Sequence, residues 1–155
     1  MENKTKVSIT EIDALDHNPM FLMGLAYKQF RAQLASHLGG AGNITLEMYG
    51  ALRVLEAHGQ ISQQQLANYL LRNRSVAKRL VDNGIKLGLI VSSKSDSNKK
   101  VKLLAITPLG QERIKQCQPI VDQQTQLFLA ALEAGPQQQL AQLLGGLIRS
   151  DLLVD

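Results

Sequence analysis

Residues 62–90, SQQQLANYLLRNRSVAKRLVDNGIKLGLI, decide the fold of this chain. They predict two short helices joined by a tight turn, because Ser62 can cap one helix and Asn73 or Ser75 can cap the next. Gly88 ends the second helix. Apolar residues recur at helical spacing on one side of each helix: Leu66, Ala67, Leu70 and Leu71 on the first, and Val76, Leu80 and Val81 on the second. Two such helices in succession are typical of a helix-turn-helix unit.

Two short strands are predicted after this pair of helices. Apolar runs at 89–91 and 101–106 flank a polar tip, SSKSDSNKK, at 92–100. Hairpin loops are usually shorter, so we expect this tip to be flexible. A helix-turn-helix followed by a β-ribbon is the layout of a winged helix-turn-helix, whose second helix enters the major groove of duplex DNA.

Longer helices are expected on both sides of this unit. Asn18-Pro19 and Thr107-Pro108 each combine a capping residue with a proline at the first helical position, which predicts a helix start. Gly39-Gly40 ends the first of these helices, and Gly135-Pro136 breaks the chain before the last one. The fold class is therefore mainly α with a small β-ribbon wing: an N-terminal arm over 1–16, a winged helix-turn-helix domain over 45–106, and flanking N- and C-terminal dimerisation helices over 17–38 and 107–153.

The flanking helices carry more apolar surface than one small domain can bury. Further apolar residues widen the stripe on 17–38, and the last helix has a broad leucine face. We therefore expect a homodimer that binds an inverted repeat in double-stranded DNA. The expected contributors to the dimer are Phe21, Leu25, Leu144 and Ile148.

The positive charge of the chain is concentrated on the winged unit. Between Arg72 and Lys102 lie nine basic and two acidic residues, a net charge of +7 that leaves −3 for the rest of a chain whose total is +4. A basic segment in an otherwise acidic molecule indicates a polyanionic partner. An apolar fraction of 45% over 155 residues supports a packed core rather than disorder.

The side chains expected to contact DNA lie at the helix starts and on the wing. Asn and Arg pair with adenine and guanine edges, whereas Ser and Lys suit phosphates. The predicted contacts are Ser62, Gln63, Asn73, Arg74, Ser75, Lys78, Arg79, Lys94, Lys99 and Lys100. The alternative is a winged-helix protein-interaction module, whose basic face binds an acidic partner.

Three segments of the winged unit match one known family in order and spacing. They are QQQLANYL at 63–70, SVAKRLVDNGIKLGLI at 75–90 and LLAITPLG at 103–110. Together they resemble the third helix, the recognition helix and the Leu-Thr-Pro-x-Gly helix start of the MarR family of bacterial transcription regulators. The resemblance is close over 45–110, and the flanking helices match in pattern. It implies a dimeric repressor that a small-molecule ligand releases from DNA.

Two positions depart from the family pattern. The wing motif Asp-x-Arg falls on Asn98-Lys99-Lys100, and lysine lacks the planar fork that favours insertion into a narrow minor groove. Gly84 stands where the family packs a leucine, at a cost of about 1 kcal/mol in helix propensity. We expect Ile85 to recover the packing by a small rotation of the helix. Both departures bear on specificity rather than on fold.

The resemblance also implies a ligand site between the dimerisation and DNA-binding regions. A small aromatic acid is the expected ligand, because Arg53 could hold its carboxylate. Each candidate could equally fill the core or make a surface contact. The candidates are Met23, Tyr27, His37, Tyr49 and Arg53.

The sequence favours no enzyme, metal or membrane class. The histidines are scattered, so neither a metal nor another cofactor is expected, and Cys117 is expected to pack in the core. No phosphate-binding glycine loop or nucleophile elbow occurs, so an enzyme is not expected. A single cysteine, no signal peptide and no long apolar run favour a cytoplasmic protein without a membrane partner.

Overall fold

Short polar caps and apolar stripes build a mainly helical chain. The computed structural model describes residues 8–41 and 44–149. Within them the elements are α1 (Asp13–Asp16), α2 (Pro19–Ala41), α3 (Leu46–His58), β1 (Ile61–Ser62), α4 (Gln63–Tyr69), α5 (Arg74–Lys86), β2 (Ile90–Lys94), β3 (Lys102–Ile106), α6 (Pro108–Leu129) and α7 (Ala134–Leu147). This order confirms the predicted class, mainly α with a small β wing.

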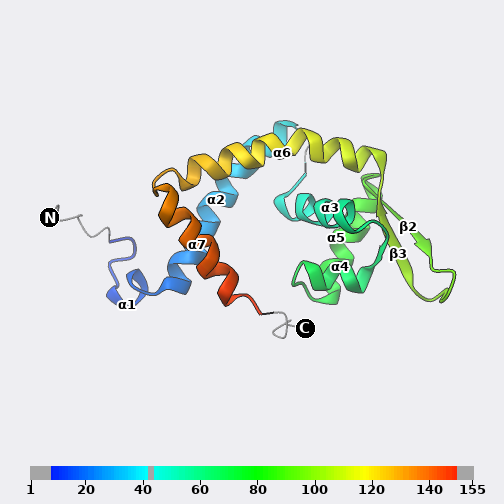
Figure 1. The fold of residues 1–155 in the computed structure, drawn as a ribbon, viewed down its shortest axis with the longest axis horizontal. Coiled ribbons are helices and arrows are strands. Elements are labelled where there is room, and N and C mark those ends of the chain that lie inside the picture. Colours follow the sequence, from blue (N-terminus) through cyan, green and yellow to red (C-terminus); the bar gives the residue numbers. More distant parts are fainter. Residues whose placement is uncertain (1–7, 42–43, 150–155) are drawn as a thin grey trace.

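Two parts of the molecule lie at opposite ends of α6 (Figure 1). The sheet and helices α3, α4 and α5 lie at one end, and α2 with α7 lies at the other. Helix α6 continues through Pro119 and packs against both α2 and α3. A hydrogen bond of 2.7 Å from Gln33 Nε2 to the buried Gln124 Oε1 joins α2 to α6. The two long helices therefore connect the winged unit to α7.

Five helices begin at a side-chain cap, and these include the four predicted starts at Asn18, Ser62, Asn73 and Thr107. Asn18 Oδ1 accepts from the backbone N–H of Phe21, and Thr45 accepts from that of Met48. Asn73, rather than Ser75, caps α5 by accepting from Val76 N at 2.9 Å. Ser62 and Thr107 cap α4 and α6 in the same way. Each such cap satisfies an orphan donor and stabilises its helix by about 1 kcal/mol.

The core lies where α3 meets α2, α5, α6 and the sheet. Leu52 and Leu55 on α3 are completely buried, as are Leu66 on α4 and Leu104 on β3. Cys117 is also completely buried, in agreement with its expected packing role. This core fixes the orientation of α4 and α5 relative to the sheet.

The wing differs from the predicted ribbon in two respects. It is a three-stranded antiparallel sheet in the order β1-β3-β2, because Ile61 and Ser62 pair with Leu104 and Leu103. Both predicted strands are present as β2 and β3, and β1 was not predicted because a two-residue strand has no detectable sequence period. Residues 92–94 of the polar tip also belong to β2, where backbone pairing with β3 holds them although their side chains are polar.

The flanking helices end at different residues than expected. Helix α2 continues through Gly39-Gly40 to Ala41. Helix α7 already begins at Ala134, with Gly135-Pro136 in its first turn. Proline is tolerated there because backbone N–H groups of the first turn have no partner within the helix, so no helical hydrogen bond is lost. It ends at Leu147, short of the predicted 153, and residues 150–155 lie outside the described part.

Part of the predicted N-terminal arm has local structure. Residues Asp13–Asp16 form the single turn α1. The Asp16 carboxylate accepts hydrogen bonds from the backbone N–H of Ile9 and Thr10 and from the hydroxyls of Ser8 and Thr10. The bond from the Thr10 backbone is the main reason that the pKa of Asp16 lies below its usual value.

Candidate nucleic-acid interface

The turn between α4 and α5 presents the N-terminus of α5. Leu71 adopts φ 50°, and the N–H groups of Leu71 and Arg72 bond back to Asn68 O and Ala67 O. These two hydrogen bonds form a Schellman motif at the end of α4. Glycine normally occupies the position of Leu71 in this motif, because a side chain is disfavoured at positive φ. The sharp turn lets α5 begin immediately at Arg74. Ala77, Val81 and Gly84 then face the core, which leaves the basic side chains exposed.

A hollow of about 550 Å³, here called the wing groove, lies between α4, the start of α5 and the base of the wing. Four cationic side chains line it, and no acidic side chain of the described residues does. It is lined by Ser62, Gln63, Gln64, Ala67, Arg74, Ser75, Ala77, Lys78, Lys100, Val101 and Lys102. Six of the ten predicted DNA contacts therefore lie together: Ser62, Gln63, Arg74, Ser75, Lys78 and Lys100.

The remaining predicted contacts are placed differently. The Asn73 side chain is occupied as the cap of α5, and Ser75 Oγ also donates to it at 3.0 Å. Arg79 lies on another side of α5 and lines a separate hollow toward α2 and α3. Lys94 and Lys99 are exposed on the wing.

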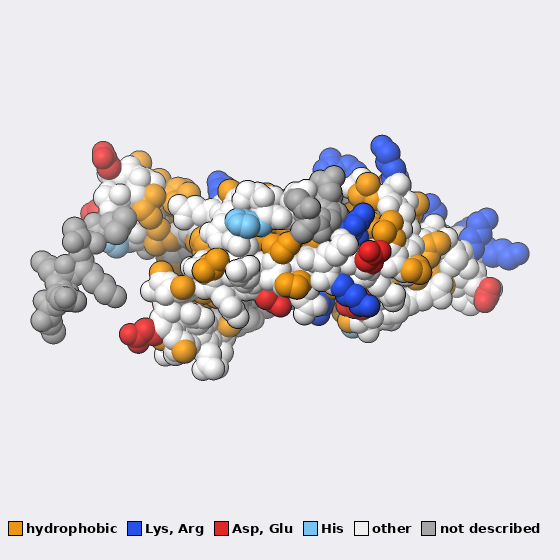
Figure 2. Space-filling model, turned by 90° about the horizontal axis from the view of Figure 1, so that it is seen from above, with side chains coloured by type: hydrophobic (Ala, Val, Ile, Leu, Met, Phe, Trp, Pro, Cys, Tyr) orange, Lys and Arg blue, Asp and Glu red, His pale blue; other side chains and the backbone are white. Residues whose placement is uncertain are grey.

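Positive charge is concentrated on the wing and at the end of the molecule that carries it. Lys94 stands directly opposite Lys102 across β2 and β3, and like charges in such a pair repel each other unless an anion lies nearby. Seen from above, Lys and Arg gather at the end of the molecule that carries the wing, on the right of Figure 2. Within α5, Asp82 partly offsets this charge through an ion pair of 2.6 Å with Lys78.

The space beside Gly84 is filled by Ile90 and not by Ile85, the residue that the sequence suggested. Ile85 is 38% exposed, so the expectation that it recovers the packing was wrong. A Cβ on Gly84 would lie 2.5 Å from Ile90 Cδ1 and 3.4 Å from Met48 Cε. The side chain of Ile90, the first residue of β2, therefore occupies the space that a larger residue would need.

The five predicted ligand residues do not form one site. Met23 and Tyr27 line an apolar groove between α2, α6 and α7. His37 is exposed, and its ring contacts Gln33 O. Tyr49 and Arg53 lie on α3, where Arg53 donates to Gln118 on α6 at 3.0 Å. Burial is the main cause that raises the pKa of Tyr49.

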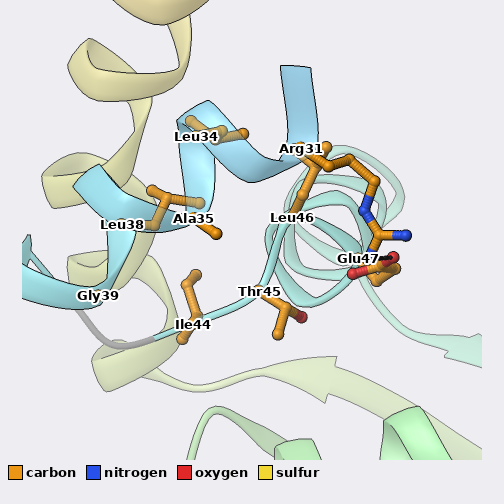
Figure 3. A pocket seen from close by; sticks show the side chains of 9 residues that line it. All are labelled: Arg31, Leu34, Ala35, Leu38, Gly39, Ile44, Thr45, Leu46 and Glu47. Atoms are coloured by element: carbon orange, nitrogen blue, oxygen red, sulfur yellow. Dashed lines mark ion pairs between the residues drawn. The ribbon is translucent and has the colours of Figure 1, made fainter. Parts of the chain in front are cut away.

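A different arginine lies between the two parts of the chain. Arg31 of α2 forms an ion pair of 2.6 Å with Glu47 of α3, and Figure 3 shows the pair at the mouth of a small pocket. A larger hollow of about 720 Å³, here called the junction pocket, extends from this pair to α5. Its charged lining is Arg31, Glu47, Arg72 and Arg79, and Tyr27 borders it. Arg31 was not among the predicted ligand residues, although it stands one helical turn after Tyr27.

The apolar groove has almost no polar surface. It is about 790 Å³ and is lined by Pro19, Leu22, Met23, Ala26, Tyr27, Phe30, Thr125, Phe128, Leu129, Leu140, Leu143, Leu144 and Leu147. Leu143 and Leu147 are 69% and 60% exposed. Contiguous exposed apolar surface of this kind marks an interaction site.

The described residues contain no cluster of candidate metal ligands, and the cysteine among them, Cys117, is buried. Between 8–41 and 44–149, no three His, Cys, Asp or Glu residues lie close enough to hold a metal ion. Burial raises the pKa of the Cys117 thiol. No helix in these two ranges is both long and apolar enough to cross a bilayer.

The sheet, the short turn and the cationic groove define a winged helix-turn-helix protein. No protein-family model matches the chain. It is similar to the uncharacterised HTH-type regulator YdcH of Bacillus subtilis, with 26% identity over 74% of this chain and 80% of the relative. It is also similar to a Thauera aromatica protein assigned to regulation of the hcr operon, with 29% identity over 81% of this chain and 74% of the relative.

Solved structures give the same answer for the fold. A protein of Pseudomonas aeruginosa classed as a transcriptional regulator superposes with a TM-score of 0.80, at 25% identity, over 86% of this chain and 99% of its own. A MarR variant of Escherichia coli complexed with operator DNA superposes with a TM-score of 0.77 at 19% identity, over 83% of this chain and 91% of the MarR chain. BpsR of Bordetella bronchiseptica superposes with a TM-score of 0.79 at 17% identity, over 84% of this chain and 92% of the BpsR chain. The chain therefore has the fold of the MarR-family winged helix-turn-helix regulators that these structures represent.

Proposed function

We propose that this protein is a homodimeric transcriptional repressor that binds duplex DNA through the wing groove and α5. The observation that carries this proposal is a groove with four cationic side chains and no acidic one among the described residues, beside an exposed helix N-terminus. Phosphates favour such a site because both the lysines and the helix dipole attract negative charge. Complexes of MarR and MepR with DNA support the proposal by fold.

The test is selection of bound duplexes from a random pool. A two-fold dimer places two α5 helices in successive major grooves, so the selected sequence should be an inverted repeat with half-sites roughly 10 base pairs apart. A single asymmetric half-site would contradict the dimeric mode. If no duplex is retained at low salt and an acidic protein is retained instead, the basic face serves a protein partner.

Replacing Arg74 and Lys100 should have different consequences. Arg74 and Arg79 lie about 140° apart around α5 and so cannot both point into one groove, and only Arg74 lines the wing groove. We expect Arg74→Ala to cost about 1–3 kcal/mol and to relax preference at one base pair. Lys100→Ala should weaken binding to all sequences and lower the salt slope by about one unit per protomer. Affinities across salt, on selected and scrambled DNA, test both; the roles are reversed if Lys100→Ala changes specificity more.

The dimer is proposed to form through the apolar groove and the exposed face of α7. Among the expected contributors, Leu144 lines this groove and Ile148 is 63% exposed, whereas Phe21 and Leu25 are half-buried within α2. A second copy would cover the apolar surface that the described residues leave in contact with solvent. The dimerisation role of 17–38 and 107–153 rests on this argument.

A small organic acid is proposed to control DNA binding from the junction pocket. BpsR, whose DNA binding is regulated by 6-hydroxynicotinic acid, and PcaV, solved with its natural ligand, share the fold. In this chain a carboxylate could replace Glu47 on Arg31 while its ring lies beside Tyr27, and Arg79 links the pocket to α5. A ligand shifts the equilibrium only if it binds the DNA-free conformation more tightly.

Arg31→Gln should reduce the sensitivity of DNA release to an aromatic carboxylate by about tenfold or more, because it removes a charge-assisted hydrogen bond. A titration of DNA release with substituted benzoates measures this. Arg53→Gln is the matched control, since Arg53 already donates to Gln118 and lies outside the junction pocket. Equal loss in both variants, or no release of the wild type by any such acid, would contradict the assignment.

A further inference from the structure

Three consecutive glutamines at the start of α4 have three different environments. Gln65 completes the capping box with Ser62, through its backbone N–H and its side-chain oxygen. Gln64 accepts a hydrogen bond of 3.0 Å from Arg74 Nε on α5. Gln63 lines the same wing groove, but no side-chain hydrogen bond joins it to any described residue. The middle glutamine is therefore the one that connects the two helices of the helix-turn-helix.

The direction of the hydrogen bonds at Gln64 is fixed by its partner. Arginine can only donate, so the Gln64 atom facing Arg74 is the amide oxygen. Its amide nitrogen then donates to Asn68 Oδ1 at 2.9 Å, one helical turn further along α4. Asn68 and Gln64 thus form a short chain of hydrogen bonds that ends on the guanidinium of Arg74.

This chain determines which edge of the guanidinium is available. Arg74 Nε already donates to Gln64, so the guanidinium cannot use Nε together with one terminal nitrogen to bind a base. The two terminal nitrogens, Nη1 and Nη2, are the donors that remain for a DNA partner. Two parallel donors match the O6 and N7 acceptors of guanine in the major groove. All three side chains are exposed, so their bonds add little to folding stability in water. The bond to Gln64 instead holds a flexible side chain in one orientation before DNA arrives.

We infer that Gln64 is a specificity-determining positioning residue: held by Asn68, it fixes Arg74 so that its terminal nitrogens contact one guanine of the DNA site. The inference rests on the proposed DNA binding and adds to it the base and the edge that Arg74 contacts. Gln64 itself does not contact the base. Gln64 affects the base preference only while Arg74 is present.

The experiment is a double-variant cycle on the selected DNA site and on sites with single base-pair changes. Gln64→Met removes the acceptor but keeps the chain length and the helix propensity. We expect it to lower the preference for one G·C pair by about three- to tenfold, with an unchanged salt slope. Arg74→Ala should lower the preference at the same pair by about tenfold or more. The variant carrying both changes should be no worse than Arg74→Ala alone, because the two residues act as a unit.

Two further variants separate positioning from other roles. Gln63→Ala is the matched control: it changes the adjacent glutamine of the same groove, so its effect should add to that of Arg74→Ala. Gln64→Glu keeps the acceptor, so it should restore the base preference while its negative charge weakens binding to every sequence. The thermal midpoint of each variant reports whether α4 remains folded.

The possible results are distinct. If Gln64→Met leaves the preference unchanged, or if its effect adds to that of Arg74→Ala at another base pair, Gln64 does not position Arg74 and the inference is overturned. If the wild-type protein retains no duplex DNA, the proposed function fails instead. Loss of preference at the Arg74 base pair, with rescue by Gln64→Glu, supports the inference.

Discussion

Leu143→Glu is expected to convert the proposed dimer to a monomer and to weaken binding to the proposed inverted repeat by about 100-fold or more. Leu143 lies in the apolar groove with 69% of its surface exposed, so the monomer tolerates the change. In the dimer the substitution would bury an unpaired carboxylate among leucines, which costs several kcal/mol. Loss of the second half-site contact then removes the gain of two linked binding events, typically 10²- to 10⁴-fold.

Sedimentation at micromolar concentration measures the association, and DNA affinity is measured on a full site and on a half-site. Leu87→Glu is the control for association, because Leu87 is also exposed, at 46%, but lies at the end of α5, away from the apolar groove. Half-site affinity of Leu143→Glu should remain close to that of wild type. A Leu143→Glu protein that sediments as a dimer would show that the two copies meet elsewhere.

Gly110→Ala is expected to destabilise the protein by about 2–4 kcal/mol. A Cβ at Gly110 would lie 2.5 Å from the backbone oxygen of Leu89 and 2.7 Å from Ile106 Cγ1. The backbone oxygen cannot rotate away, because Leu89 O also accepts from Thr107 N at 3.0 Å. The first turn of α6 would therefore have to move away from the sheet, and the thermal midpoint should fall by about 5–15 °C at fixed protein concentration.

Two other glycines give matched controls for this measurement. At Gly84 the obstacle is the flexible end of Ile90, so Gly84→Ala should stay within about 1 kcal/mol of wild type. At Gly50, within α3, nothing lies within 4 Å of the added Cβ, and alanine should stabilise the helix by about 0.5–1 kcal/mol. Equal effects at the three positions would mean that close packing at Gly110 is not the cause.

Local chemistry explains why much of the fold could be predicted from the sequence. Asn18, Thr45, Ser62 and Thr107 each bond to a backbone N–H two or three residues later, so the signal and its effect lie within one helical turn. The clustering of charge between Arg72 and Lys102 was equally visible without coordinates. These signals located the helix-turn-helix, the wing and most of the residues that line the wing groove.

Contacts between distant segments decided the rest. Strand β1 exists because Ile61 meets Leu104, and the space at Gly84 is filled from β2 rather than by its neighbour Ile85. The ion pair of Arg31 with Glu47 and the hydrogen bond of Gln64 with Arg74 each join two helices. A residue pattern specifies what a side chain can do within its own helix or strand. Which side chain it meets across the core depends on how the elements pack, since partners far apart in the chain are brought together only when the apolar faces are buried.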